Sequence, residues 1–264
     1  MRTRREPPPW RTVAVGEVVA LTPRLVHLTL VGPALTSFDP GLPGASLRLL
    51  VPDADRDLDV AVPVLPRWNG NEFRHEDGSR AVIRTLTPLV PVTPVDGPAI
   101  AVAVVLHGHG PLATWAASTR PGERLAIAGT GRGYEIDPAA GSFLLAGDES
   151  ALPAITTILP ALPAAASVHV VVELADPGAR LDLPSHPGAH VQWCEAAAGD
   201  APGTAVVGAV ASAELGPDTR VWAAGEAAAM QRIRRHLTDE RDVPRSRAVV
   251  RGYWKHGRAG GDED

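Results

Sequence analysis

Residues 142–159, SFLLAGDESALPAITTIL, are the stretch that decides the fold of this chain. The apolar run at residues 143–146 predicts a buried strand, and Gly147 follows it as a sharp turn. Ser150 is predicted to cap the helix that follows, and Pro153 is tolerated in its first turn. A strand that feeds a helix through a tight glycine turn directs free backbone N–H groups at one point. Such a turn suits a phosphate.

The composition excludes several classes of protein. The chain has 264 residues and a formal net charge of −5, which argues against nucleic acid as the main partner. The lone Cys194 excludes a disulfide framework, a four-cysteine zinc site and an iron–sulfur cluster held by this chain alone. No apolar run reaches the roughly 18 residues that span a bilayer. The basic start, MRTRREPPPW, lacks the apolar segment of a secretory signal, so we expect a cytoplasmic protein with no membrane partner.

Short β-patterned runs fill the first half of the chain, and turn residues separate them. They lie at residues 12–20, 25–31, 46–51, 81–87, 99–107 and 124–128. This pattern predicts a six-stranded antiparallel barrel. Residues 52–79 are weakly patterned and are predicted to form a long loop with at most one extra strand. Residues 108–119 predict a single helix between the last two strands.

The second half alternates strands and helices. Strands are predicted at residues 143–146, 167–174, 189–193, 220–224 and 247–253, and helices at residues 151–159, around 207–214 and at 226–240. This alternation indicates a parallel sheet covered on both faces, whose ligands bind beyond the carboxyl ends of the strands. We therefore expect one domain at residues 10–135 and another at residues 140–257, with flexible tails at residues 1–9 and 258–264.

A barrel with one inserted helix, followed by a parallel α/β domain, is the order expected of flavin reductases that resemble ferredoxin–NADP reductase. Seven segments in order also resemble the siderophore-interacting protein family of cytosolic, flavin-dependent ferric-siderophore reductases. They are RTLT (84–87), VVLHGHGPLATWA (104–116), RPGERL (120–125), LLAGDESALPAI (144–155), VWAAGEA (221–227), IRRHL (233–237) and GYWKHG (252–257). The resemblance implies an antiparallel flavin-binding β-barrel followed by a parallel-sheet, NAD(P)-binding α/β domain.

The resemblance implies FAD as cofactor, because the family binds it through an Arg-x-Tyr-Thr/Ser segment. Carried over, Arg84 contacts the pyrophosphate and Thr87 lies near the reactive edge of the flavin as the catalytic residue. A planar guanidinium suits this role because it can bind two oxygens at once. Leu86 replaces the family's tyrosine and offers neither π-stacking nor a phenol, so flavin affinity and potential could differ. Without the surrounding segment, Arg84 would read as a solvated charge on an edge strand.

The family's second flavin contact corresponds to the segment around the predicted helix start. The implied contacts with the adenosine half and the pyrophosphate are Leu106, His107, Gly110, Leu112, Ala113 and Thr114. His107 is equally well explained as a hydrogen-bonded turn histidine. A metal pair of His107 and His109 is disfavoured, because it supplies only two ligands and no carboxylate is close in sequence.

The opening stretch resembles the family's nicotinamide-dinucleotide segment, with Gly-Asp-Glu-Ser in place of a glycine-rich turn. Asp148 and Glu149 are expected to accept hydrogen bonds from ribose hydroxyls and to repel a 2′-phosphate, which favours NADH over NADPH. The alternative is that both are simply charges favourable to a helix N-terminus. The remaining predicted contacts of this site are Ser150, Ala224, Gly225 and Glu226.

Lys255 is the only lysine among 25 basic residues. It lies beside His256 in a cationic, aromatic segment suited to an anionic ferric siderophore, so both residues are predicted substrate contacts. The alternative is that one lysine must fall somewhere.

The implied reaction passes electrons from NAD(P)H through FAD to Fe(III) in a siderophore, and reduction releases Fe(II). A ferredoxin-like protein is a possible alternative donor. Two rival functions remain: a general NAD(P)H:flavin or quinone oxidoreductase, and a non-catalytic siderophore-binding protein whose degenerate flavin site Leu86 marks.

Overall fold

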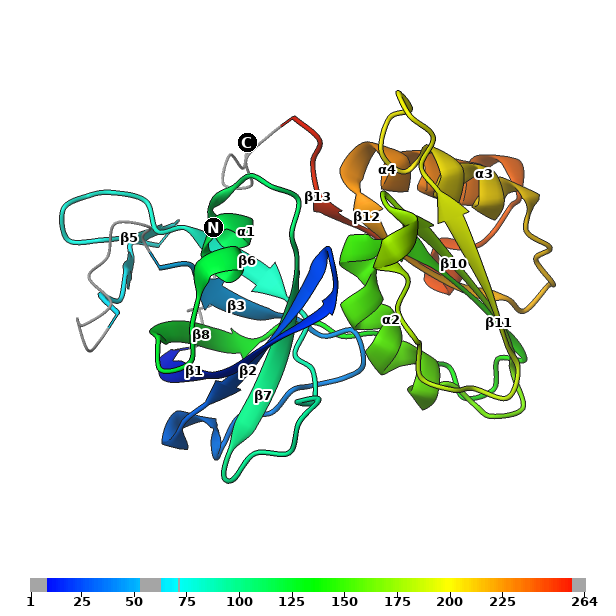
Figure 1. Ribbon diagram of the computed structural model, residues 1–264. Coiled ribbons are helices and arrows are strands. Elements are labelled where there is room, and N and C mark those ends of the chain that lie inside the picture. Colours follow the sequence, from blue (N-terminus) through cyan, green and yellow to red (C-terminus); the bar gives the residue numbers. More distant parts are fainter. Residues whose placement is uncertain (1–8, 53–62, 71, 258–264) are drawn as a thin grey trace. The chain divides into compact units, whose positions relative to one another are not determined.

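The computed structural model describes residues 9–52, 63–70 and 72–257. The chain divides into two compact units, with the boundary between Gly133 and Tyr134 (Figure 1). Apart from Pro9, the tails predicted at residues 1–9 and 258–264 lie outside the described residues. None of the helices in the described ranges has the length and apolarity that crossing a bilayer requires.

Unit 1, which ends at Gly133, is an antiparallel barrel. In its described part, a six-stranded sheet runs in the order β6-β3-β8-β1-β2-β7, and its two end strands contact each other. The predicted barrel is therefore confirmed. The strands are β1 (Trp10–Thr22), β2 (Leu25–Val31), β3 (Leu47–Leu50), β6 (Ile83–Leu86), β7 (Ala99–Val105) and β8 (Arg124–Thr130).

The barrel core follows from the alternation of side chains along each strand. On β2, Val26, Leu28 and Leu30 enter the core, whereas His27 and Thr29 point to the other face. Helix α1 (Pro111–Ser118) is the predicted inserted helix, and it packs against the same core through Trp115. A short 3₁₀ turn, η1 (Pro33–Leu35), follows β2.

The long loop predicted over residues 52–79 contains two short strands, so the expectation of at most one was wrong. Strands β4 (Arg67–Trp68) and β5 (Phe73–Arg74) pair antiparallel. The ring of Phe73 lies 5.0 Å from that of Trp68 and 5.3 Å from that of Trp10 in β1. Aromatic packing onto β1 therefore holds this hairpin. Residues 53–62 and 71 lie outside the described residues.

Unit 2, which begins at Tyr134, is built on a parallel sheet. In the described residues its five strands run in the order β11-β10-β9-β12-β13, and each pair of neighbouring strands is parallel. The strands are β9 (Ser142–Asp148), β10 (Ser167–Leu174), β11 (Ala189–Glu195), β12 (Arg220–Glu226) and β13 (Ala248–Trp254). The parallel α/β part of the predicted fold class is confirmed.

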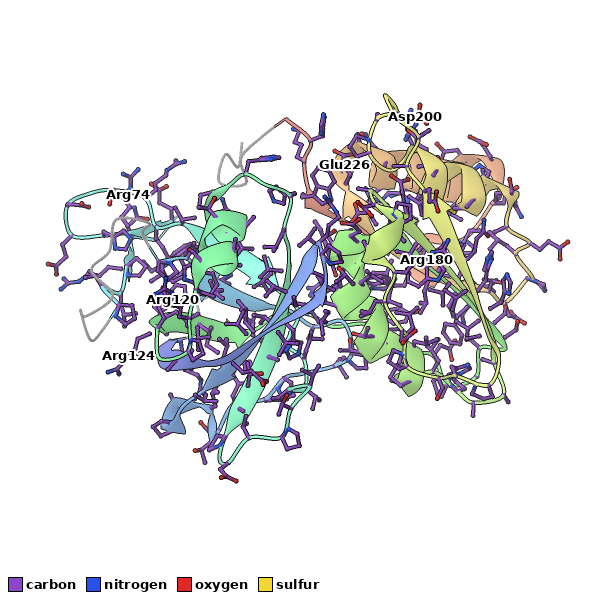
Figure 2. All side chains as sticks on the ribbon, in the orientation of Figure 1. Arg74, Arg120, Arg124, Arg180, Asp200 and Glu226 are labelled. Carbon is purple, nitrogen blue, oxygen red and sulfur yellow. The ribbon has the colours of Figure 1, made fainter. Side chains whose placement is uncertain are left out.

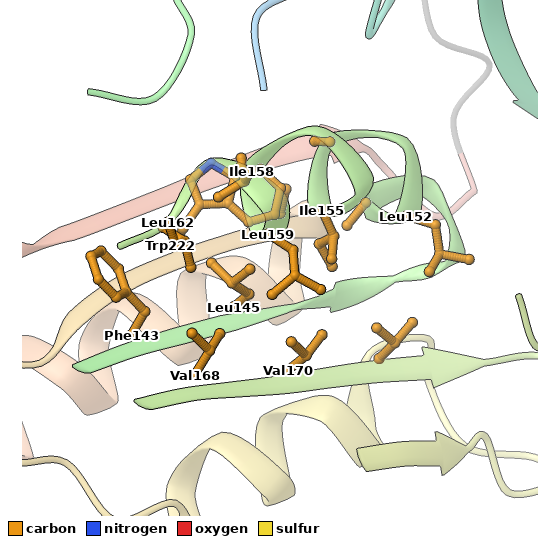
Figure 3. Close-up of a cluster of buried hydrophobic side chains, with 14 of the residues drawn as sticks. Phe143, Leu145, Leu152, Ile155, Ile158, Leu159, Leu162, Val168, Val170 and Trp222 are labelled. Atoms are coloured by element: carbon orange, nitrogen blue, oxygen red, sulfur yellow. The ribbon is translucent and has the colours of Figure 1, made fainter. Parts of the chain in front are cut away.

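Helices cover both faces of this sheet, as predicted (Figure 1). Helix α2 (Leu152–Ile158) packs on one face, where Ile155 and Ile158 meet Leu145 and Trp222 (Figure 3). Helices α3 (Thr204–Ser212) and α4 (Ala227–Arg235) cover the other face. A π-helical turn, η5 (His236–Glu240), completes the predicted helix at residues 226–240. The 3₁₀ turns are η2 (Glu149–Ala151), η3 (Leu159–Ala161), η4 (Pro177–Ala179) and η6 (Arg245–Arg247).

Candidate functional site

Arg84 is a partly buried cation on the edge strand β6. It pairs with Leu49 of β3, so its side chain lies on the face of β6 that also carries Leu86 toward the barrel core. Burial lowers the pKa of the guanidinium, which nevertheless stays charged. Its Nη1 donates to the carbonyl of Ile83 at 2.9 Å, and no carboxylate of the described residues lies within ion-pair distance. An anionic ligand would supply the missing charge.

The two residues predicted beside Arg84 differ in their surroundings. Leu86 pairs with Leu47 and packs against the barrel core. Thr87 follows β6 and is buried, with 8% of its surface exposed. The roles of Leu86 and Thr87 toward a flavin stay predictions.

The N-terminus of α1 has backbone N–H groups to offer. Gly110 stands at the N-cap with φ of 84°, and it has no side chain to cap the helix. Pro111 carries no N–H, and the N–H groups of Leu112 and Ala113 have no acceptor within the described residues. A helix N-terminus with free N–H groups attracts an anion. Arg84 and this helix start therefore give unit 1 two features that fit a pyrophosphate.

His107 and His109 lie in front of α1. Their rings approach edge to face with centroids 4.4 Å apart, and Nδ1 of His109 lies 3.0 Å from the carbonyl oxygen of His107. No group of three or more His, Cys, Asp or Glu side chains that could hold a metal ion occurs within the described ranges. Leu106 packs against the barrel core, and Thr114 is exposed on the first turn of α1.

In unit 2, Asp148 ends β9 and accepts hydrogen bonds from four donors. Its Oδ1 accepts from the N–H of Ser150 at 2.9 Å and from the Ser150 hydroxyl. Its Oδ2 accepts from the N–H of Glu226 and from Nε1 of Trp254, both at 2.8 Å. Burial raises the pKa of the Asp148 carboxyl, while these donors oppose that shift by favouring the ionised form.

The prediction that Ser150 caps the helix was wrong. Asp148 is the cap, because its short side chain reaches the N–H of Ser150 at the start of η2. The Ser150 hydroxyl donates to the same carboxylate, so it too serves the turn.

Two glycines allow the ends of β9 and β12 to approach each other. A Cβ on Gly147 would lie 2.3 Å from the carbonyl oxygen of Ala224. Gly225 has φ of 154°, and a Cβ there would lie 2.6 Å from Oδ2 of Asp148. The structure thus brings the predicted residues of both strand ends together, as the parallel sheet implied.

Glu149 and Glu226 bind backbone N–H groups of unit 2. Glu149 accepts from the N–H of Ala175 at 2.8 Å. Glu226, labelled in Figure 2, accepts from the N–H of Ala229 in α4 at 2.8 Å and from that of His256 at 3.2 Å. Ribose contacts of Asp148 and Glu149 stay a prediction, although protein donors already occupy both oxygens of Asp148 and Oε1 of Glu149.

Further acids at this edge of the sheet escaped the sequence reading. Glu173 accepts from the N–H of Gly203 at 2.7 Å and from that of Val206 at 2.9 Å, at the start of α3. Asp176 accepts from the N–H of Gly178 at 2.7 Å and caps η4. The sequence did hold a signal, because each of the buried runs LLAGDE, VVVELAD and VWAAGE ends in an acid.

The last described segment carries the predicted substrate contacts. Lys255 and His256 are exposed at the end of β13, and Trp254 is 39% exposed. The hydrogen bond from Trp254 to Asp148 and that from the His256 N–H to Glu226 hold this segment on the sheet. The predicted substrate contacts therefore lie on a segment that two acids of the edge fix in place.

Family models match both units. The model of the siderophore-interacting FAD-binding domain matches residues 14–134, and that of the siderophore-interacting protein matches residues 140–257. An uncharacterized protein of Mycobacterium tuberculosis is 35% identical over 268 residues, which cover 94% of this chain and 92% of that protein.

Two further proteins are similar. The crystal structure of a siderophore utilization protein from T. fusca has 30% identity and a TM-score of 0.79, over 96% of this chain and 95% of that one. The ferric vibriobactin reductase of Vibrio cholerae is 30% identical over 158 residues, 58% of each chain. A phthalate dioxygenase reductase and the FAD/NAD-binding domain of a nitric oxide dioxygenase, at 15–16% identity, share the ferredoxin reductase-like fold, and at that identity the likeness shows the fold alone.

Proposed function

Because the chain belongs to the siderophore-interacting protein family, we propose that it is an FAD-dependent oxidoreductase that reduces Fe(III) held by a siderophore. Fe(II) binds the hard oxygen ligands of siderophores more weakly than Fe(III), so reduction releases the iron. The similarity to a ferric vibriobactin reductase supports this substrate class. A reduced nicotinamide, NAD(P)H, is the proposed electron source, which the ferredoxin reductase-like fold supports.

The observation that carries the proposal is the anion-receptive surface of unit 1. Arg84 is a half-buried cation without an acid partner in the described residues, and the N–H groups of Leu112 and Ala113 are free there. These groups fit the pyrophosphate of FAD, which the matched domain family binds. When bound, FAD supplies a carrier that takes up two electrons and passes them on singly. We assign the FAD domain to residues 10–135.

The residues of the barrel would hold and orient the flavin. The guanidinium of Arg84 would bind the pyrophosphate, and Gly110, with φ of 84°, leads the backbone into α1, whose N–H groups would face the same anion. Thr87 would place its hydroxyl near the reactive edge. Leu86 would leave that edge without a stacked aromatic ring, because it packs on the barrel core.

We assign the siderophore to residues 140–257, at the exposed end of β13. Lys255 and His256 present cationic and hydrogen-bonding groups there, next to the half-exposed Trp254. An anionic ferric chelate would be attracted by the ammonium group and would pack on the indole. A general flavin or quinone reductase would not need this segment.

Replacing Lys255 with alanine is expected to raise KM for an anionic ferric tris-catecholate about fivefold at low salt and to leave kcat unchanged, because one exposed charge contact is worth roughly 1 kcal/mol. Iron(II) capture by a coloured chelator measures both constants. Lys255→Arg should restore most of the affinity. Arg180→Ala is the matched control, because it also removes one exposed positive charge, here at a residue that pairs with Glu195. An unchanged KM for Lys255→Ala would remove Lys255 from the substrate site.

A further inference from the structure

The carboxyl edge of the unit 2 sheet has carboxylates where a nucleotide-binding sheet would receive phosphate. In the described residues, the helical segments that follow β9, β10, β11 and β12 all begin at this edge. At each of these starts, a carboxylate of unit 2 itself accepts hydrogen bonds from backbone N–H groups. The pairs are Asp148 with η2, Asp176 with η4, Glu173 with α3 and Glu226 with α4.

The carboxylates accept hydrogen bonds of ordinary length from these N–H groups. The distances from oxygen to nitrogen are 2.9 Å for Asp148 to Ser150 and 2.7 Å for Asp176 to Gly178. Glu173 bridges two N–H groups of α3, and Glu226 binds α4 at 2.8 Å. A phosphate bound at any of these starts would therefore have to displace an internal anion. At Asp148, Glu173 and Glu226 the displaced carboxylate would lie in a largely buried region.

The negative charge of these acids also disfavours a phosphate at this edge. No arginine or lysine of the described residues forms an ion pair with Asp148, Glu173, Asp176 or Glu226. Three of these four acids are at least nine-tenths buried, so solvent and salt screen their charge poorly. Like charges a few ångströms apart repel strongly under such conditions. Arg180, the described cation nearest in sequence to one of these acids, pairs with Glu195 at 3.6 Å instead.

Unit 1 shows the opposite arrangement. The N–H groups at the start of α1 have no acceptor in the described residues, and Arg84 has no acid partner there. The chain therefore leaves a phosphate-receptive helix start in the barrel and fills the comparable starts in the α/β unit.

We propose that Asp148, Glu173, Asp176 and Glu226 exclude the pyrophosphate of a dinucleotide from this edge, so that a reduced nicotinamide is recognised without it. This proposal rests on the proposed function, in which a reduced nicotinamide is the electron donor. Reduced nicotinamide mononucleotide, which lacks the pyrophosphate and the adenosine, should then serve as well as NADH or NADPH. The predicted preference for NADH over NADPH disappears for the same reason.

Anaerobic bleaching of the FAD-loaded protein tests this proposal. The kcat/KM values for NADH, NADPH and reduced nicotinamide mononucleotide should agree within about threefold. A kcat/KM for either dinucleotide that exceeds that for the mononucleotide thirtyfold or more, equivalent to about 2 kcal/mol, would overturn the proposal.

A variant sharpens the test. Asp148→Ser removes one internal anion and should raise the kcat/KM for NADH, relative to that for the mononucleotide, at least threefold. Asp218 is an exposed acid paired with Arg247, and Asp218→Ser should not change this ratio. An unchanged ratio in a folded Asp148→Ser protein counts against the proposal. If this variant does not fold, the wild-type ratio still decides.

Failure of the proposal is distinguishable from failure of the proposed function. No bleaching by any of the three donors, in a protein whose chemically reduced FAD still reduces a ferric chelate, overturns the proposal and leaves the ferric reductase intact. If all three donors bleach the flavin at equal rates but no ferric chelate is reduced, the result supports the proposal and refutes the proposed ferric-siderophore substrate.

Discussion

Replacing Glu173 with alanine is expected to lower the free energy of unfolding by about 2–4 kcal/mol, because two buried backbone N–H groups lose their acceptor. Glu173 is 4% exposed, and its two oxygens bind the N–H groups of Gly203 and Val206. Gly203 stands at the N-cap of α3 and has no side chain to take over. The first turn of α3 would be left without its cap.

Urea unfolding followed by circular dichroism measures this loss. Glu173→Gln keeps one carbonyl acceptor and should lose about half as much. Glu195→Ala is the matched control, since Glu195 is an exposed glutamate whose partner Arg180 is 3.6 Å away, and it should change the stability little. A Glu173→Ala protein as stable as the wild type would show that Glu173 is not the cap of α3.

Replacing Arg84 with alanine is expected to raise the dissociation constant of FAD roughly thirtyfold, because charge-assisted hydrogen bonds to a phosphate are worth about 2 kcal/mol. Truncation removes the half-buried charge of β6 and, since Arg84 has no acid partner in the described residues, leaves no carboxylate unpaired. The fold should therefore survive.

Quenching of flavin fluorescence on titration measures this affinity. Arg84→Lys keeps the charge but loses the planar fork, and should fall between the two. Arg48→Ala is the matched control: Arg48 is exposed on the adjacent strand β3 and pairs with Thr85, so it lies on the opposite face from Arg84. Equal effects of Arg48→Ala and Arg84→Ala would mean that Arg84 contributes only long-range charge.

The sequence predicted the strands most accurately where a continuous run of residues is buried. The predicted limits of β2 (Leu25–Val31) and β10 (Ser167–Leu174) agree with the structure to the residue. Strand β10 places Val168, Val170 and Val172 in the core on one covered face of the sheet, and turn residues bound β2. Met230, Ile233 and Leu237, spaced three and four residues apart, lie on the buried face of the last helix.

The hairpin of β4 and β5 was missed because two-residue strands have no period, and because Trp10, which packs on Phe73, is distant in sequence. The internal donors of Asp148 were not predicted for a similar reason. The sequence places it beside Ser150, but two of its donors, Glu226 and Trp254, lie 78 and 106 residues away. The local pattern indicated an acid at a helix start, and only the folded sheet shows which donors bind the Asp148 carboxylate.

A single-turnover experiment tests the central claim, that the chain passes electrons from FAD to siderophore-bound iron. The FAD-loaded protein is reduced photochemically without oxygen and mixed with excess ferric tris-catecholate and an Fe(II)-capturing dye. We predict reoxidation of the flavin with about two Fe(II) captured per FAD, since each iron takes one electron. Free reduced FAD at the same concentration, mixed with the same chelate, gives the background rate. Flavin that stays reduced, or that reoxidises no faster than this control, would contradict the account.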